Sequence, residues 1–388
     1  MRSIILRVRT LLIPVVLVLA IAGVAPPASA ITLDTNAREA ILLDFDTGQI
    51  LYERNADELM PPASMSKIMT VYLAFERLKD GRLKMEDTVP VSEKAWQKGG
   101  SKMFIQVGSR VKISDLLRGI IVQSGNDAAI ALAEAIGGSE EAFAELMTQK
   151  ARDLGMVQST FRNATGWPDP DHRMTARELA ILATAMIRNF PEYYSIYSET
   201  EFTYNDIRQG NRNPLLYKNM GADGVKTGHT ENAGYGLTAS AVRDGRRLIL
   251  VVNGLDSVNA RSTESERFLD WGFREFDNYP LFEKAQVVSD ADVWIGDKQA
   301  VPLISKRDIT LTLPRVSRRE MTVKVEYEGP IPAPIEAGQQ LATLRVSAPD
   351  MEDRTFPLYA GESVGKLGPL GRITSAIGYL VWGPSRGG

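Results

Sequence analysis

Hydrophobic positions between residues 37 and 276 predict strands at the two ends of this region and helices between them. Apolar runs at 40–45 and 49–52, separated by the turn Asp46-Thr47-Gly48, predict a hairpin near the start. Three further strand patterns follow much later in the chain, at 226–230, 234–241 and 247–253. We therefore expect one sheet built from the first and last parts of the region.

Between these strands, apolar residues recur with the spacing of amphipathic helices. The expected helices span 64–80, 114–121, 128–136, 140–154 and 175–189, and a closing helix at 262–276 follows the last strand. Thr175 stands where a helix cap is expected, and Ser124-Gly125-Asn126-Asp127 interrupts two helices.

The pattern changes near residues 278–280 to short alternating segments separated by turns. They predict strands at 286–288, 292–295, 309–313, 321–327 and 341–346. We expect a small all-β domain over 283–366, after a first domain over 31–278.

Both ends of the chain carry apolar segments of other kinds. A basic start, an apolar run at 11–24 and the small residues Ala28-Ser29-Ala30 predict a signal peptide over 1–30, and hence export. The tail at 367–388 places apolar residues on one helical face within 369–382. This pattern fits a helix lying on a membrane surface or one docked on the β-domain, and we favour the membrane.

Composition narrows the chemistry. A net charge of −3 over 388 residues gives no indication of nucleic-acid binding. The chain has no cysteine and two histidines, so no thiol nucleophile is available and a metal site or other cofactor is not expected. We therefore look for chemistry among serines, lysines and amides.

Ser64 and Lys67 are the first candidates. They lie three residues apart at the start of an expected helix, so the hydroxyl and the amine can meet on one face. An amine beside a hydroxyl at the electropositive end of a helix is a plausible activated nucleophile. Ser64 also has a simpler interpretation as a helix N-cap.

Two tripeptides supply further candidates. Ser124-Gly125-Asn126 offers a hydroxyl and an amide, although such a sequence is also a common helix-breaking turn. Lys226-Thr227-Gly228 offers a cation and a hydroxyl on an expected strand, although an edge-strand lysine also protects against aggregation. Gly228 would let a second backbone come close.

Taken together, these motifs resemble those of the penicillin-recognising serine enzymes: Ser-x-x-Lys, Ser-x-Asn and Lys-Thr-Gly. The flanking residues resemble more closely the low-molecular-mass penicillin-binding proteins of the D-alanyl-D-alanine carboxypeptidase type. The similar segments are 62–70, 124–128, 161–166, 211–213 and 223–230. The resemblance implies an α+β, β-lactamase/transpeptidase-like domain with helices inserted into an antiparallel sheet, followed by the all-β domain and an amphipathic helix. A histidine motif at His172 we interpret as structural.

The resemblance also implies a mechanism. Ser64 attacks the bond between two terminal D-alanines of a peptidoglycan stem peptide, Lys67 acts as base with a lowered pKa, and Ser124 relays a proton to the leaving amine. The substrate-binding residues are Asn126, Lys226, Thr227, Gly228, His229 and Arg212. The backbone amides of Ser64 and His229 form the oxyanion hole, and β-lactams act as covalent inhibitors.

Three alternatives remain open. A β-lactamase shares the motifs but deacylates quickly, and it usually lacks the β-domain. An endopeptidase that cuts cross-links usually lacks it too. A non-catalytic wall-binding scaffold is the third, and the intact Ser64, Lys67, Ser124, Asn126 and Lys226 argue against it. We expect an exported periplasmic enzyme on the outer face of the inner membrane, with a role in wall biogenesis and cell shape.

Overall fold

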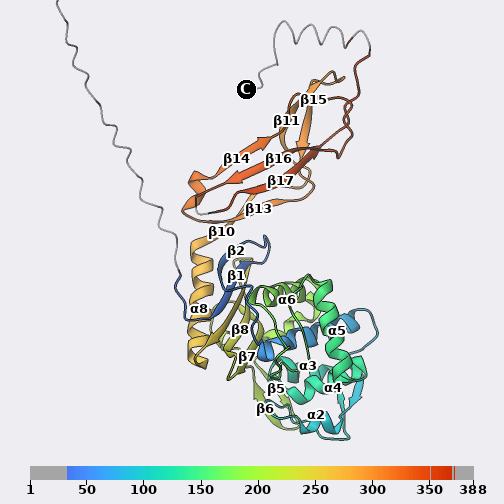
Figure 1. Ribbon diagram of the computed structural model, residues 1–388, viewed down its shortest axis with the longest axis vertical. Helices are drawn as coiled ribbons and strands as arrows, with labels where there is room; N and C mark the ends of the chain where they lie inside the picture. The colour runs from blue at the N-terminus through green and yellow to red at the C-terminus, as the bar shows by residue number, and fades with distance from the viewer. Residues whose placement is uncertain (1–32, 350, 369–370, 372–388) are drawn as a thin grey trace, which may run out of the picture. The chain divides into compact units, whose positions relative to one another are not determined.

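The computed structural model describes residues 33–349, 351–368 and 371 (Figure 1). The expected signal peptide lies outside these residues, and so does the expected tail helix apart from Gly371. Within the described part of the chain, no helix is long and apolar enough to cross a membrane. The described residues form one compact unit, which contains two main sheet systems.

The first system is a five-stranded antiparallel sheet in the order β2-β1-β9-β8-β7. Its strands are β1 (Glu39–Asp44), β2 (Ile50–Arg54), β7 (Ala222–Thr230), β8 (Gly234–Arg243) and β9 (Arg246–Leu255). The sheet therefore joins the two ends of the region, as predicted. Strand β7, which carries Lys226, is an edge strand.

The alternation of side chains along these strands places helices on both faces of the sheet. Ile41, Ile249 and Val251 belong to the large core formed with the inserted helices. On the other face, Leu42 and Leu248 approach Gly272 of the closing helix α8 (Val258–Glu275), where a Cβ would lie 2.8 Å from either leucine. A larger residue at position 272 would push α8 away from the sheet.

The inserted region between β2 and β7 is mainly helical (Figure 1). Its helices are α1 (Lys67–Lys79), α2 (Glu93–Gln97), α3 (Ile113–Ile121), α4 (Asn126–Gly137), α5 (Glu140–Asp153), α6 (Ala176–Asn189) and α7 (Pro191–Tyr194). Short 3-10 turns are η1 (Ala63–Ser66), η2 (Ser195–Ser198) and η3 (Pro214–Tyr217), and two small hairpins are β3 (Thr88–Pro90) with β4 (Arg110–Lys112) and β5 (Glu201–Tyr204) with β6 (Ile207–Gly210).

Most predicted helices are confirmed within two residues. Thr175 caps α6 as expected, because its side chain accepts a hydrogen bond from the Glu178 amide. The cap interpretation of Ser64 is wrong: Ser64 lies inside η1, and α1 starts at Lys67 with no side-chain cap. Helix α1 is buried along almost all its length, so it is part of the core, and its first residue, Lys67, belongs to the site.

The second sheet system begins directly after α8. A six-stranded sheet has the order β14-β16-β17-β12-β11-β15, and β10 pairs with β13. The strands are β10 (Phe276–Phe282), β11 (Val287–Trp294), β12 (Ala300–Ile304), β13 (Ile309–Pro314), β14 (Thr322–Glu326), β15 (Ile331–Pro332), β16 (Gln340–Ser347) and β17 (Arg354–Ala360), with one 3-10 turn, η4 (Ser317–Glu320). This is the expected all-β domain.

Four of these strands were not predicted, and each contains a proline: Pro280, Pro302, Pro332 and Pro357. Proline lacks the amide hydrogen that a ladder needs, so it lowers the expectation of a strand. Here Pro302 still stands opposite Asp290, and Pro357 opposite Thr343. Strand pairing in the folded domain therefore tolerates prolines that, in the sequence alone, argue against a strand.

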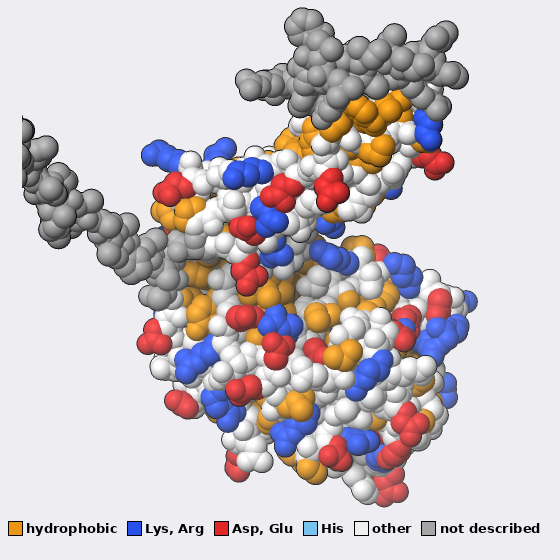
Figure 2. Space-filling model, turned by 45° about the horizontal axis from the view of Figure 1, so that its top comes forward, with side chains coloured by type: hydrophobic (Ala, Val, Ile, Leu, Met, Phe, Trp, Pro, Cys, Tyr) orange, Lys and Arg blue, Asp and Glu red, His pale blue; other side chains and the backbone are white. Residues whose placement is uncertain are grey.

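The surface carries mixed charge. On the face drawn in Figure 2, Lys and Arg side chains lie among Asp and Glu side chains, and neither sign gathers into a large patch. This agrees with the small net charge of −3.

Candidate active site

Ser64 is held in a tight turn below the edge strand. The preceding residue, Ala63, has a left-handed backbone with φ of 49°, and the Ser66 hydroxyl donates to the Ala63 carbonyl over 3.1 Å. The turn presents Ser64 Oγ to Lys67 Nζ at 2.9 Å. Because the hydroxyl does not cap the helix, it is free for chemistry.

Lys67 is fully buried and has three oxygen neighbours. Besides Ser64 Oγ, its Nζ donates to Asn126 Oδ1 over 2.8 Å and to the Thr165 carbonyl over 2.6 Å. Burial, followed by the charge of Arg212, lowers the pKa of Lys67 to about 7. A neutral amine has two N–H bonds and one lone pair. If Asn126 and Thr165 take the two N–H bonds, the lone pair faces the Ser64 hydroxyl.

Ser124 and Asn126 lie where the sequence predicted a break between helices. Ser124 has a left-handed backbone with φ of 67°, and its buried hydroxyl has no hydrogen-bond partner within the described structure. Asn126 opens α4, and its Nδ2 donates to the Gly99 carbonyl over 2.8 Å. The Asn126 side chain thus orients Lys67 as well as lining the cleft.

Asp127 is a residue that sequence reasoning missed as part of the site. Its buried carboxylate accepts the amide hydrogens of Met103 and Phe104, each over 2.9 Å, and so holds the backbone segment 103–105 in place. Its negative charge also opposes the lowering of the Lys67 pKa. A signal was present, since an acidic residue directly follows the Ser-x-Asn motif at a helix start.

The loop at 161–168 forms the wall opposite β7. Gly166 has φ of 75°, and a Cβ there would lie 1.8 Å from the Ala63 carbonyl oxygen. Glycine therefore lets the loop reach the nucleophile turn and bring the Thr165 carbonyl to Lys67. Sequence reasoning noted 161–166 only as a similar segment, because a backbone carbonyl leaves no side-chain signal.

Strand β7 supplies the other wall. Lys226 and Thr227 are buried there, and a Cβ on Gly228 would lie 2.8 Å from the Pro62 carbonyl oxygen. Burial, together with repulsion from Lys67 and Arg212, lowers the pKa of Lys226 well below its usual value. The His229 ring stacks on Tyr235 with centroids 3.9 Å apart.

Two arginines add positive charge at the end of the cleft. Arg212 Nη1 donates to Ser101 Oγ over 2.6 Å, and burial lowers its pKa. Arg261, from the first turns of α8, was not predicted; burial lowers its pKa to about 10, and its Nε has no partner within the described residues. An anionic group entering the cleft would meet both guanidinium groups.

These elements enclose a cleft of about 960 Å³. Seven of the nine predicted site residues line it: Ser64, Ser124, Asn126, Arg212, Thr227, Gly228 and His229. Lys67 lies beneath Ser64, and Lys226 is buried in β7 between Val225 and Thr227. His172 does not line the cleft; burial lowers its pKa to about 4, so it is neutral. Among the described residues, no group of His, Cys, Asp or Glu is arranged to hold a metal ion.

Comparison with known families now identifies the chain. Residues 24–257 match the family model described as D-alanyl-D-alanine carboxypeptidase. Residues 276–366 match the one described as penicillin-binding protein 5, C-terminal domain. Together these matches cover both sheet systems.

Individual relatives agree with these family matches. The chain is 41% identical to D-alanyl-D-alanine carboxypeptidase DacC of Escherichia coli, over 87% of this chain and 86% of the relative. The crystal structure of penicillin-binding protein 5 from Haemophilus influenzae is 37% identical, with a TM-score of 0.79, and the match covers 89% of this chain and all of that one. Penicillin-binding protein D2 of Listeria monocytogenes in its ampicillin-bound form is 29% identical, with a TM-score of 0.58, over 62% of this chain and 99% of that one. The chain therefore belongs to the D-alanyl-D-alanine carboxypeptidases, the penicillin-binding serine peptidases that act on peptidoglycan.

Proposed function

We propose that this protein removes the terminal D-alanine from peptidoglycan stem pentapeptides through an acyl-enzyme on Ser64. The observation that carries the proposal is the pair formed by Ser64 Oγ and Lys67 Nζ at 2.9 Å, with Asn126 and Thr165 holding the amine from the other side. An amine with a pKa of about 7 is neutral in about half of the molecules at neutral pH.

Acylation follows from this arrangement. Lys67 Nζ takes the Ser64 hydroxyl proton while Oγ attacks the carbonyl carbon between the two D-alanines. The backbone amides of Ser64 and His229 hold the developing oxyanion, each donor lowering the barrier by about 3 kcal/mol. The C–N bond then breaks: the departing amine of D-alanine takes the Ser124 hydroxyl proton, and Ser124 regains a proton from the Lys67 ammonium, which leaves Lys67 neutral for deacylation. The unpartnered, buried Ser124 hydroxyl supports this role.

The buried cations bind the substrate's terminal carboxylate in this proposal. Lys226 and Thr227 hold it from β7, with Arg212 in support, and Asn126 and Gly228 lie along the peptide backbone. Deacylation uses water, with Lys67 again as base. A β-lactam acylates Ser64 by the same step, because its carbonyl and carboxylate occupy the same places.

Two substitutions test the proposal. Ser64→Ala should abolish D-alanine release from a synthetic stem pentapeptide, and mass spectrometry should find no penicillin adduct. Lys226→Met should lower kcat/KM about ten- to a hundredfold, because a charge-assisted hydrogen bond is lost. The Lys226→Met substitution should have much less effect on kcat/KM for a peptide whose terminal carboxylate is amidated. Release of D-alanine by Ser64→Ala at the wild-type rate would refute the proposal.

The same experiment separates the alternative functions. A penicillin adduct that persists favours the peptidase, whereas rapid turnover favours a β-lactamase. Cleavage of cross-linked wall fragments at a rate similar to that of pentapeptides would favour an endopeptidase. No adduct and no cleavage would favour a scaffold.

The chain ends carry a proposal of their own. We infer that residues 1–30 direct export, that a catalytic domain (31–278) and an all-β domain (283–366) follow, and that 369–382 attach the protein to the outer face of the inner membrane. The support is the sequence pattern of both termini. Deleting 369–388 should move the protein from the membrane fraction to the periplasmic fraction; no change would refute the attachment.

A further inference from the structure

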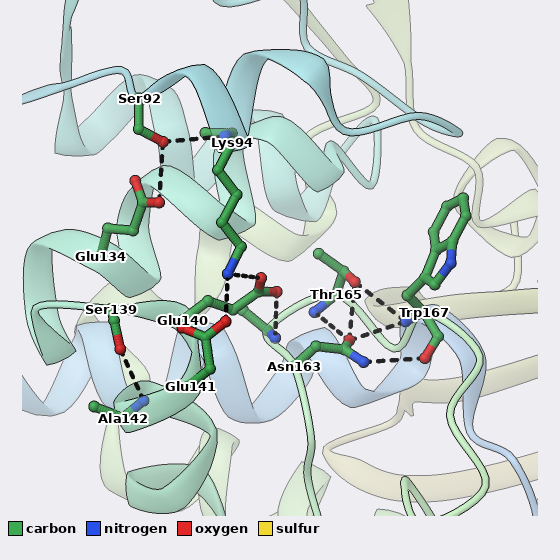
Figure 3. Close-up of polar contacts among 12 residues, drawn as sticks. Ser92, Lys94, Glu134, Ser139, Glu140, Glu141, Ala142, Asn163, Thr165 and Trp167 are labelled. Carbon is green, nitrogen blue, oxygen red and sulfur yellow. Dashed lines mark hydrogen bonds and ion pairs between the residues drawn. The ribbon is translucent and has the colours of Figure 1, made fainter.

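Three charged residues, Lys94, Glu140 and Glu141, form a cluster that contacts the loop at 161–168 (Figure 3). Lys94 of α2 reaches Glu140 and Glu141 in the first turn of α5, at 3.0 and 2.6 Å. The two carboxylates differ in burial: the Glu140 side chain is 7% exposed and that of Glu141 is 73% exposed. Glu140 therefore points inward, and Glu141 remains at the surface.

The inward carboxylate contacts the backbone that serves Lys67. Glu140 Oε1 accepts the amide hydrogen of Ala164 over 3.1 Å. The Ala164 carbonyl accepts the Thr70 hydroxyl over 2.8 Å, and the next carbonyl, that of Thr165, accepts Lys67 Nζ over 2.6 Å. The amide held by Glu140 and the carbonyl that contacts Lys67 thus belong to adjacent residues, with one peptide group between them.

The other side of the same backbone is held by Asn163. Its Oδ1 accepts from the Thr165 amide over 3.1 Å and from the Trp167 amide over 3.0 Å (Figure 3). Asn163 shapes the turn locally, but its contacts remain within the loop. Glu140 ties that turn to α5, and Lys94 ties Glu140 to α2.

We propose that Glu140, held by Lys94, is a positioning residue that places the Thr165 carbonyl on Lys67 and so directs the Lys67 lone pair at Ser64. This inference rests on the proposed role of Lys67 as base. A carbonyl that moved away would let an N–H bond of the amine turn toward Ser64 Oγ, and the lone pair would no longer face the hydroxyl.

Charge gives the proposal a second readout. The charged groups that act on Lys67 from the surrounding elements are Arg212, Asp127, Lys98, Glu140, Lys226 and His172 when it is protonated. Of these, Asp127 and Glu140 raise the pKa of Lys67, against the larger effect of burial. Removing the Glu140 charge should lower that pKa, so the acidic limb of the pH–rate profile should move to lower pH.

Three variants of the full chain test the proposal by the rate of Ser64 acylation with a labelled penicillin between pH 5 and 9. Glu140→Ala removes the acceptor and the charge, and we expect the rate to fall about ten- to a hundredfold with little change in KM for the pentapeptide. Glu140→Gln keeps an oxygen for the Ala164 amide, so its rate should fall less while its acidic limb moves to lower pH. Glu141→Gln is the matched control, because it removes the charge from a contact with the same lysine and changes no contact with the loop.

The outcomes separate cleanly. A slow Glu140→Ala, a shifted Glu140→Gln and an unchanged Glu141→Gln support the proposal. The proposal is overturned if both Glu140 variants acylate Ser64 at rates within twofold of Glu141→Gln and their acidic limbs lie at the same pH as that of Glu141→Gln. If Glu140→Ala does not fold, Glu140→Gln decides alone. Ser64→Ala tests the proposed function independently. A failure of the proposed function would therefore be detected whatever the results with the Glu140 variants.

Discussion

Basic side chains have opposite surroundings in the cleft and in the β-domain. In the cleft, Lys67, Lys226 and Arg261 are buried, and within the described structure none of them forms an ion pair; burial lowers the pKa of each. In the β-domain, Arg345 is exposed and pairs with Glu326 at 2.8 Å and Asp353 at 3.2 Å. The hydrogen bond with Glu326 raises the pKa of Arg345.

This difference separates functional from structural charge. Exposed ion pairs contribute little to stability, because water already solvates both partners. Buried cations without carboxylate partners are costly, and proteins keep them where an anion or a proton must be handled. The cleft therefore holds the buried, unpaired basic groups on which the proposed chemistry depends.

The largest expected effect follows from removing the buried amine. Lys67→Met should slow Ser64 acylation by at least about a thousandfold, because Lys67 is the one basic side chain among the described residues that is hydrogen-bonded to the hydroxyl. Arg345→Met is the matched control in the β-domain and should leave the acylation rate unchanged. Both rates are measured with a labelled penicillin on protein whose folding is checked by thermal unfolding. Equal rates in the two variants would remove the distinction between the regions.

The next effect concerns how the cleft is closed around the nucleophile. Gly166→Ala should destabilise the protein and slow acylation, because its Cβ would overlap the Ala63 carbonyl oxygen at 1.8 Å. Gly48→Ala has a similar backbone, with φ of 70°, but meets nothing within 4 Å. It should cost only about 1–2 kcal/mol of backbone strain in urea unfolding and no activity. A Gly166→Ala enzyme as active as Gly48→Ala would contradict the close approach.

A smaller effect is a shift of the pH–rate profile. Acylation needs neutral Lys67, so the rate should rise with pH through about 7. Arg212 lowers that pKa, so Arg212→Gln should raise it and move the acidic limb to higher pH. Arg208→Gln is the control, since Arg208 is exposed and pairs with Glu201. An unmoved or downward limb in Arg212→Gln would show that its charge does not act on Lys67.

The smallest effect is expected where exposed charge is removed. Arg345→Met should change the melting temperature by less than about 2 °C, and the difference should not depend on salt. A large drop, lost at high salt, would show that the β-domain depends on its ion pairs.

The sequence was a good guide to the side chains that gather at the cleft. Ser64 and Ser124 line it, Lys67 contacts Ser64, and Thr227, the neighbour of Lys226 on β7, lines it as well. It was a poor guide to residues that act through the backbone. Thr165 contributes a carbonyl and Asp127 accepts amide hydrogens, and neither function requires a distinctive local pattern.

Long-range partners were also beyond the local pattern. Arg261 lines the cleft from a helix that follows the last strand of the sheet in the sequence, and Glu140 reaches the loop at 161–168 from the first turn of α5. Neither position stands out in its own segment. The four strands that contain a proline were not predicted for a related reason, since their pairing depends on neighbours far away in the chain.

By itself, the sequence determined the strands at the two ends of the first region and the main helices between them, the all-β character of the second domain and the chemical types available for catalysis. These follow from hydrophobic period, turn residues and motif spacing, which are local properties. Only the tertiary structure decided which groups are desolvated and which atoms touch. Burial depends on every element packed around a residue, so the lowered pKa of Lys67 and the three oxygen atoms around its Nζ are properties of the fold.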